Sequence, residues 1–192
     1  MKKILIALGF TFAAMSSQAA LTFTSTGQTI AIAPAGDGTN NATGQTAGTT
    51  FDYGFLSAEA GDIITFTNLQ SFVEAGYTNL FINGTDVFSN KSGNGDTFSF
   101  TSTGGQLSFL FKDANGVEFG NGDSSIGVVA GSAYGFVDQF VLLLDDSAVG
   151  FTDFDDHVVG VSAVPVPAAL PLLASALGAF GIARRRNKAK AA

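Results

Sequence analysis

Alternating apolar and polar residues dominate the middle of the chain. In residues 97–101 phenylalanine alternates with serine and threonine, and residues 107–111 repeat the alternation after Gly104 and Gly105. Successive side chains of a β-strand point to opposite faces, so a period of two predicts strands with one buried face. We expect the two segments to pair as a hairpin across the glycines, with their large apolar side chains facing the core.

Further strands are predicted where short apolar or alternating runs are bounded by glycine, asparagine or aspartate. These runs are residues 21–25, 29–33, 50–56, 62–68, 79–82, 117–119, 125–129, 139–144 and 157–162. The uninterrupted apolar run 140–144 is typical of a central strand covered on both faces. Residues 113–116 end in Asn-Gly, which supplies the positive φ of a tight turn, and predict a hairpin leading into 117–119. The polar, glycine-rich residues 34–49 predict a long loop.

The fold class follows from these short strands and their turns. Helical periodicity in this region is confined to a hint at residues 58–60. The pattern therefore predicts an all-β fold, an antiparallel β-sandwich or jelly roll. Nineteen phenylalanines and no tryptophan suit a sheet interior, because phenylalanine buries a large area without a polar atom. The chain has no cysteine, so disulfides are excluded and stability must come from apolar burial, with or without bound cations.

The first 19 residues have the pattern of a signal peptide. Lys2 and Lys3 precede an apolar run, residues 4–14, and small residues then lead to a cleavage site between Ala19 and Ala20. The 11-residue apolar run is too short to span ~30 Å of hydrocarbon. The sequence therefore predicts export across the inner membrane, with the Sec machinery and signal peptidase as partners.

The C-terminal end has the pattern of a single membrane-spanning helix. Residues 164–183 are uncharged, and 20 residues in a helix rise ~30 Å. Their three prolines all lie in the first eight positions, so we expect an extended start and a transmembrane helix over about 168–183. Arg184, Arg185 and Arg186 open a basic stop, residues 184–190, that predicts a cytoplasmic C-terminus with the main domain outside.

These three C-terminal parts resemble a known sorting signal. The segment Val164-Pro165-Val166-Pro167-Ala168, the apolar helix and the terminal arginines are similar to the PEP-CTERM sorting domain in its VPxPA variant. That domain occurs on exported proteins of Gram-negative bacteria that make exopolysaccharide. The resemblance covers about the last 30 residues, and Val166 stands where the Pro-Glu-Pro form has glutamate. It implies an exosortase, a transpeptidase-like membrane protease, that cuts near the motif and releases or transfers the protein to the cell surface or the exterior. Simple retention by the helix is the competing interpretation.

Charge is concentrated between the two ends. All 16 acidic residues lie within residues 20–163, where Lys91 and Lys112 are the only basic residues, so this region has a formal charge of −14. The value for the whole chain is −7. An acidic field disfavours nucleic acid and anionic membranes and favours solubility and cation binding. The expected organisation is a signal peptide at 1–19, an acidic β domain at 20–163 and a sorting tail at 164–192.

Five of the carboxylates fall within a 12-residue window between two apolar strands. They are Asp145, Asp146, Asp153, Asp155 and Asp156. Ca²⁺ takes about six to eight oxygen ligands at ~2.3–2.6 Å, which turn carboxylates and carbonyls can supply. The spacing is not that of an EF-hand. The sequence therefore leaves two interpretations, a solvated acidic turn that closes the last hairpin and a Ca²⁺ site.

The same window resembles a pattern common just upstream of PEP-CTERM tails, a hydrophobic strand, Asp-Asp, a glycine-bearing loop and Asp-x-Asp-Asp before a final strand. The matching positions are Leu142 to Asp146, Gly150, Asp153, Asp155, Asp156, Val158 and Val159. This resemblance implies a β-sandwich secretory domain with a divalent cation site. Residues 120–123, Gly-Asn-Gly-Asp, match one unit of the glycine-aspartate calcium repeat, and a single unit predicts a turn rather than a metal site.

The sequence gives little support for an enzymatic activity. His157 is the only histidine and cysteine is absent, which excludes thiol nucleophiles and multi-histidine metal sites. The Gly-x-Ser-x-Gly elbow is missing, and we expect His157 to be a surface residue at a strand start. Asp153 and Asp156 could in principle hydrolyse glycosides, but the sugar platforms usual beside such acids are scarce in a chain without tryptophan.

The sequence therefore favours an exported, noncatalytic surface or matrix protein stabilised by Ca²⁺. The alternative is a carbohydrate-binding or adhesin module that contacts exopolysaccharide through Tyr53, Tyr77 and Tyr134. A secreted hydrolase is the third possibility.

Overall fold

The computed structural model describes residues 21–32, 39–40, 42–70, 78–146, 153–165 and 177. The predicted signal peptide, its Ala19–Ala20 cleavage site and residues 166–168 of the sorting motif lie outside these ranges, as does the basic stop. The predicted membrane helix does so too, apart from Leu177. Within the described ranges, no helix has the length and apolar character needed to cross a membrane.

The described domain is all β and its strands pair antiparallel, which confirms the predicted fold class at this level. The strands are β1 (Thr22–Ala31), β2 (Thr39–Asn40), β3 (Gln45–Thr46), β4 (Thr50–Gln70), β5 (Leu80–Asn83), β6 (Thr85–Ser89), β7 (Thr97–Gln106), β8 (Leu110–Lys112), β9 (Glu118–Gly120), β10 (Ile126–Ala130), β11 (Phe140–Leu144) and β12 (His157–Val164). A short 3-10 turn, Gly131–Tyr134, follows β10. All the strands belong to one compact unit, Ala19–Val164.

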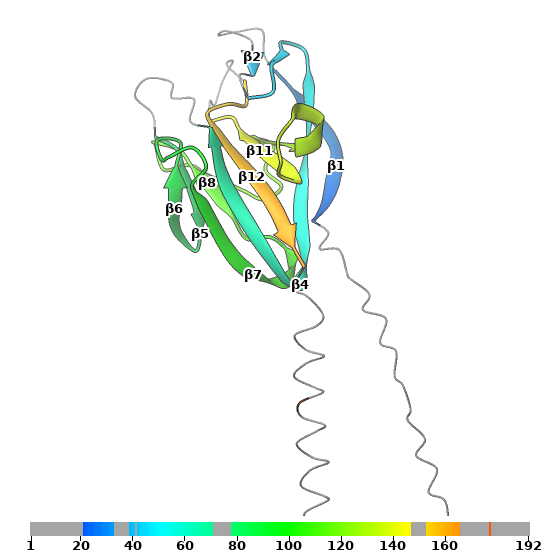
Figure 1. The fold of residues 1–192 in the computed structure, drawn as a ribbon. Helices are drawn as coiled ribbons and strands as arrows, with labels where there is room; N and C mark the ends of the chain where they lie inside the picture. Colours follow the sequence, from blue (N-terminus) through cyan, green and yellow to red (C-terminus); the bar gives the residue numbers. More distant parts are fainter. Residues whose placement is uncertain are drawn as a thin grey trace, which may run out of the picture. The chain divides into compact units, whose positions relative to one another are not determined.

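Two sheets carry the fold (Figure 1). The larger has the order β1-β4-β10-β11-β12, with β7 also paired to β4 and β12 returning to pair with β4. The smaller has the order β6-β5-β8-β9, and β2 and β3 form a separate two-stranded ribbon. The Ile32 N–H donates a hydrogen bond to the Thr49 carbonyl, which joins the segments on either side of that ribbon. Part of the predicted loop 34–49 is therefore a short hairpin.

Strand β4 organises the larger sheet. Its N-terminal half pairs with β1, and its C-terminal half pairs with β12 on one side and β7 on the other. The predicted strands 50–56 and 62–68 are thus two halves of one strand. The helical hint at residues 58–60 was wrong, because these residues continue the strand up to a bulge between Ala60 and Ile63, where Gly61 takes φ 96°.

The predicted hairpin between residues 97–101 and 107–111 was wrong. Strand β7 runs on through Gly104 and Gly105 and pairs with β4, whereas β8 pairs with β5 and β9 in the other sheet. The long ladder that β4 offers is the better partner for β7. The glycines remain within it because each takes φ near 90°, and a Cβ added to Gly104 would lie only 3.2 Å from the Cβ of Ala60.

The second predicted hairpin, through residues 113–116, is confirmed as the β8–β9 pair. The Asp113 carboxylate accepts hydrogen bonds from the backbone N–H groups of Asn115 and Val117 at 2.9 and 2.7 Å. Gly116 takes φ 86°, as the Asn-Gly signal required.

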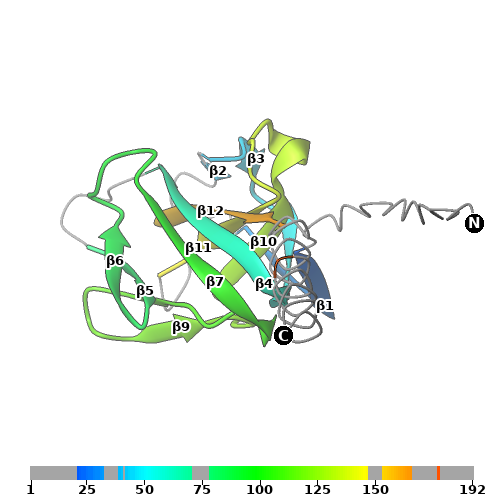
Figure 2. The same cartoon turned by 60° about the horizontal axis from the view of Figure 1, so that its bottom comes forward.

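The core lies between the two sheets and is built mainly from phenylalanine. Phe66 of β4, Phe81 of β5 and Phe111 of β8 have no exposed surface, and the Phe81 ring lies 4.7 Å from that of Phe66 and 5.2 Å from that of Phe111. In Figure 2, β5, β6 and β9 lie beside the larger sheet. Leu142 and Leu144 of β11 join this core, while the alternate residues Val141 and Leu143 join a second cluster on the opposite face. The prediction that 140–144 is covered on both faces is therefore confirmed.

Candidate metal centre

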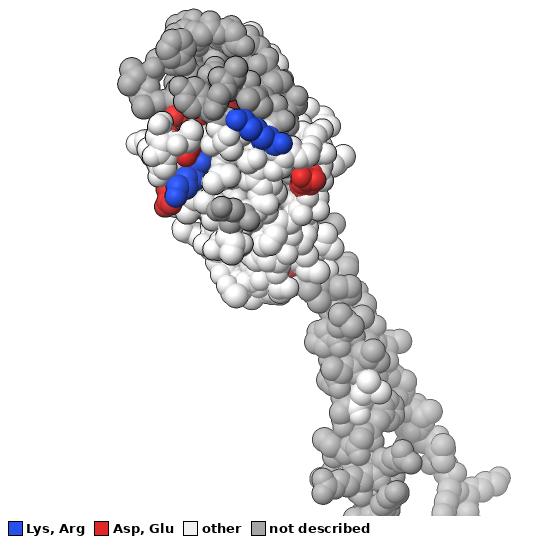
Figure 3. All heavy atoms as spheres, turned by 90° about the vertical axis from the view of Figure 1, so that its left-hand side faces the viewer, with Lys and Arg blue, Asp and Glu red and all other residues white. Residues whose placement is uncertain are grey.

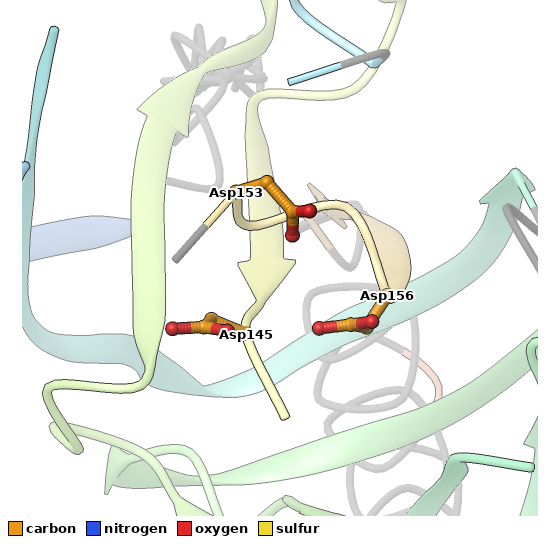
Figure 4. Close-up of side chains that lie close together, drawn as sticks. All are labelled: Asp145, Asp153 and Asp156. Atoms are coloured by element: carbon orange, nitrogen blue, oxygen red, sulfur yellow. The ribbon is translucent and has the colours of Figure 1, made fainter. Parts of the chain in front are cut away.

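The acidic segment lies where β11 ends and β12 begins. These strands are antiparallel neighbours, with Leu144 opposite His157, so the residues just beyond their ends meet. The backbone N–H of Asp156 donates to the Leu144 carbonyl at 3.1 Å, and that of Asp145 donates to the Ser125 carbonyl at 2.9 Å. The register of the sheet thus brings Asp145 next to Asp156 (Figure 4).

Three of the five predicted carboxylates come together. Asp145, Asp153 and Asp156 each offer a carboxylate oxygen, and these oxygens all lie within 4.8 Å of one another. Asp145 and Asp156 are only 5% and 7% exposed, and Asp153 is half-buried. Two oxygens that each lie about 2.4 Å from one ion are at most ~4.8 Å apart, so the separation fits a shared Ca²⁺. We call these three residues the carboxylate cluster.

The other two predicted ligands lie outside the carboxylate cluster. The Asp146 carboxylate accepts a hydrogen bond from the side-chain amide of Asn79 at 2.7 Å, while its backbone N–H donates to Asp156 Oδ2 at 2.7 Å. Asp155 is 5% exposed and is not one of the three converging residues. Asp146 is therefore outside the cluster, but its backbone N–H helps to hold the Asp156 carboxylate in place.

Burial perturbs the central carboxylate. Removal from water raises the pKa of Asp156 to about 8, with smaller contributions from the carboxylates of Asp146, Asp153 and Asp145, against the lowering effect of the Asp146 N–H. The raised pKa favours the protonated form of Asp156 at neutral pH. The alternative of a solvated acidic turn does not fit, because Asp145, Asp155 and Asp156 are all buried.

A buried aromatic residue shapes the turn between these carboxylates. Phe154 has φ 61°, in the left-handed region that non-glycine residues rarely adopt, and its side chain is fully buried. Its ring packs edge-on against Phe51 at 5.3 Å. Burial of the ring offsets a backbone cost of about 1–3 kcal/mol and fixes the directions of the flanking aspartates.

The prediction that His157 is a surface residue was wrong. It has no exposed surface, and its ring lies 6.0 Å from that of Phe88 and 5.3 Å from that of Phe111. Its Nε2 lies 3.2 Å from Asn68 Oδ1, and because the Asn68 amide nitrogen donates to backbone carbonyls, that oxygen accepts and Nε2 carries the hydrogen. Burial lowers the pKa of His157 to about 3, so the ring is neutral.

The sequence held a signal for this burial. His157 alternates with Val159 and Val161, which face the main core, so the period of two that places the valines inside places the histidine inside as well. Nothing in the sequence pointed to Asn79 or Asn90, which also contact the acidic segment.

Residues 120–123 form the turn expected for them. The Asn121 side chain accepts a hydrogen bond from the Leu56 N–H at 2.9 Å and donates to the carbonyls of Leu56 and Leu107 at 2.8 and 2.9 Å. Its polar atoms are therefore used to join the turn to β4. The turn is structural in this domain.

The tyrosines considered for glycan binding do not have a shared role in the described part of the domain. Tyr53 contacts Gln28 of β1 through its hydroxyl group, and Tyr134 packs against the second apolar cluster. Tyr77 lies outside the described residues.

Comparison of the chain with protein-family models, with curated proteins and with solved structures finds no match. The assignment of a function therefore rests on the chemistry of the carboxylate cluster and on the patterns at the two chain ends.

Proposed function

We propose that this chain is an exported, noncatalytic surface or matrix protein whose β-sandwich domain binds Ca²⁺ and is stabilised by it. The observation that carries the metal assignment is the convergence of Asp145, Asp153 and Asp156, whose carboxylate oxygens lie within 4.8 Å of one another in a largely buried setting. The two sheets that share the phenylalanine core support the sandwich part of the proposal.

The donor set favours a hard cation. The candidate ligands are all oxygen, cysteine is absent, and His157 is used in the core. Oxygen donors suit Ca²⁺, Mg²⁺ and Mn²⁺ rather than softer metals. Three carboxylates on two separate segments suit the variable geometry of Ca²⁺ better than Mg²⁺, which keeps several waters and is usually held by one or two carboxylates.

A cation at this position stabilises the folded state through charge. Without an ion, burial and the neighbouring carboxylates keep Asp156 protonated, and a divalent ion that displaces this proton attracts all three carboxylates at once. Because the unfolded chain lacks the assembled site, the free energy of binding adds to the free energy of unfolding. The domain has a formal charge of −14, which increases this gain.

Thermal unfolding with Ca²⁺ and with EGTA tests the metal assignment. A ligand at 100 times its Kd adds ~2.7 kcal/mol, so we expect a clearly higher midpoint with Ca²⁺. Asp153→Asn should abolish the difference, whereas Asp52→Asn, which removes an equal charge from an exposed position on β4, should preserve it. Equal midpoints with Ca²⁺ and EGTA for the unaltered chain would overturn the assignment.

The tail supports the sorting part of the proposal. A signal peptide at 1–19 and a proline motif, apolar run and basic stop at 164–192 are the expected address of a protein handled by Sec, signal peptidase and an exosortase-type protease. In this proposal the C-terminal helix anchors the protein transiently, with its domain outside, before release to the surface or the exterior.

The structure sets the design of the sorting test. Val164 is the last residue of β12 and pairs with Ile63, so the tail should be removed after Val164 rather than before it. We expect the truncated protein to lose its normal cell fraction, and unchanged localisation would refute the sorting proposal. A double variant, P165A/P167A, separates processing from retention. If a protease reads the prolines, the intact mass of the variant will include the tail that the mature parent protein lacks.

A further inference from the structure

Two asparagines close the base of the β5–β6 hairpin. Asn79 directly precedes β5 and Asn90 directly follows β6. The backbone N–H of Asn79 donates to Asn90 Oδ1 at 3.1 Å, and the backbone N–H of Asn90 donates to the Asn79 carbonyl at 3.0 Å. The two residues are 1% and 2% exposed, so this closure is buried.

Both side chains also reach the acidic segment. Asn79 Nδ2 donates to the Asp146 carboxylate at 2.7 Å, and Asn90 Nδ2 donates to the backbone carbonyl of Asp156 at 3.1 Å. The base of the hairpin is therefore joined at two points to the segment that carries the carboxylate cluster. The first of these contacts is charge-assisted, the stronger kind of hydrogen bond.

The contacts continue into the cluster itself. The Asp146 backbone N–H, next to the carboxylate that holds Asn79, donates to Asp156 Oδ2 at 2.7 Å. Asp156 is in turn one of the three residues whose oxygens converge. The position of the Asp156 carboxylate thus sets the position of Asp146, and Asp146 holds the hairpin.

The amide that holds Asp146 also has a polar atom without a partner in the described part of the chain. Asn79 Oδ1 is buried and has no hydrogen-bond partner among the described residues, although it belongs to the amide that grips Asp146. Buried polar atoms nearly always have a partner, and an unpaired one calls for an explanation such as a bound ion or water. An amide oxygen is also a donor that Ca²⁺ accepts.

We propose that a cation in the carboxylate cluster locks the β5–β6 hairpin onto the larger sheet through Asn79 and Asn90. This inference rests on the Ca²⁺ binding proposed above and assigns it a structural consequence. The ion fixes the Asp156 carboxylate, Asp146 is then held by its N–H, and the Asn79 and Asn90 contacts follow. When the ion leaves, nothing draws the three carboxylates together, so the segment loosens and the hairpin is released before the rest of the domain unfolds.

The hairpin is a unit that can loosen in this way. Among the described strands it joins the smaller sheet only through the short pairing of β5 with β8, at residues 80–82. It nevertheless supplies Phe81 and Phe88 to the core. Loss of the cation therefore weakens the side of the core that faces the smaller sheet.

Hydrogen exchange on the full-length chain, with Ca²⁺ at saturation and with EGTA, tests the inference. Losing one or two buried hydrogen bonds, one of them charge-assisted, should speed exchange in β5 and β6 by about 10-fold to 100-fold in EGTA. Exchange in β10 and in the N-terminal half of β4 should change little. Calorimetric titration with Ca²⁺ accompanies the measurement.

The outcomes separate the two proposals. If calorimetry shows no Ca²⁺ binding, the proposed metal site is wrong and the inference falls with it. If Ca²⁺ binds but exchange changes only around the acidic segment, the metal site stands and the lock is refuted.

The variant Asn90→Ala isolates the connection, because it removes the contact with the Asp156 carbonyl and leaves the Asn79 amide in place. It should bind Ca²⁺ with an affinity within a few-fold of the parent, while β5 and β6 exchange rapidly in both conditions. Asn83→Ala is the matched control, because Asn83 lies at the opposite end of β5 and its side chain contacts the Ser108 carbonyl. This control should keep the Ca²⁺ dependence. The comparison on the unaltered chain decides the question by itself if Asn90→Ala does not fold.

Discussion

Asp156 and His157 are neighbours in the sequence, and both are buried. Desolvation disfavours the charged form of each, so it raises the pKa of the acid to about 8 and lowers the pKa of the imidazole to about 3. The two groups therefore make the free energy of unfolding depend on pH in opposite directions.

Replacing His157 by glutamine should flatten the acid side of the stability profile. The unfolded chain takes up a proton at this residue below its ordinary pKa of 6.5, whereas the folded chain does so only near 3. The unfolded state binds more protons between these values, so the free energy of unfolding falls as pH drops from 6.5 to 3. Urea unfolding of parent and variant across this range measures the effect, and identical slopes would contradict it.

For Asp156 the expected dependence is the reverse, and it is visible only without the cation. The folded chain keeps the carboxyl proton up to pH about 8, whereas the unfolded chain releases it near 3.8. In EGTA the free energy of unfolding should therefore fall as pH rises from 3.8 to 8. Saturating Ca²⁺ should remove this fall, since the ion replaces the proton.

The variant Asp156→Asn checks this assignment. It should lose both the pH dependence in EGTA and the response to Ca²⁺, as measured by the same urea titrations. A variant that still responded to Ca²⁺ with the parent's midpoint shift would place the ion elsewhere.

At the scale of elements, side-chain amides join turns to strands that are distant in sequence. Asn121 joins the turn before β10 to β4 and to the segment before β8, and Asn68 binds the loop that precedes β7. Such contacts keep turns in place where no sheet ladder is available.

Truncation of Asn121 should be costly. Asn121→Ala removes three hydrogen bonds and leaves the N–H of Leu56 and two carbonyls without those partners, so we expect a loss of about 2–3 kcal/mol in urea unfolding. Asn115→Ala, in the exposed turn between β8 and β9, is the control and should cost less than about 1 kcal/mol. The Ca²⁺ response of Asn121→Ala should be unchanged, because the 120–123 turn is structural.

The strands could be predicted from the sequence, but several of their partners could not. Alternation states which face of a strand is buried, not which strand lies beside it, so the segment 97–101 was identified while its pairing with β4 was missed. The interruption of the alternating pattern at Gly61 likewise suggested that a strand ends there, although a β-bulge lets β4 continue.

Only part of the candidate site could likewise be predicted from the sequence. Charge density alone identified the acidic segment, but the choice of Asp145, Asp153 and Asp156 depends on the register of β11 against β12 and on the left-handed Phe154. Asn79 and Asn90 had no local signal, since they lie more than 50 residues from the acids that they contact.

At the scale of the whole molecule, a large negative charge is distributed unevenly. Six of the carboxylates are buried in the described part of the domain, namely Asp62, Asp113, Asp138, Asp145, Asp155 and Asp156. Among the described residues there is one ion pair, between Lys112 and Glu118 at 3.6 Å. The face in Figure 3 shows both acidic and basic side chains within a largely uncharged surface. Salt therefore screens the repulsion among exposed carboxylates, but it screens the repulsion among buried carboxylates much less.

Simple salt should accordingly stabilise the domain only in part. Raising NaCl shortens the screening length from about 30 Å at 0.01 M to about 10 Å at 0.1 M, which weakens repulsion among exposed carboxylates and should raise the unfolding midpoint. Adding Ca²⁺ at constant ionic strength should give a further rise, because the buried cluster is screened less. A midpoint that falls with NaCl would contradict this account.

The end of β12 at Val164 has a mechanical consequence. This strand lies between β11 and β4, and Pro165 follows it directly. A tension applied to the C-terminal end along the strand would enter the domain through β12. Inter-strand hydrogen bonds run perpendicular to the strands, so such a load is shared across two ladders at once and resisted in shear rather than broken one bond at a time. A domain built in this way can withstand a force on its C-terminal end without β12 detaching from the sheet.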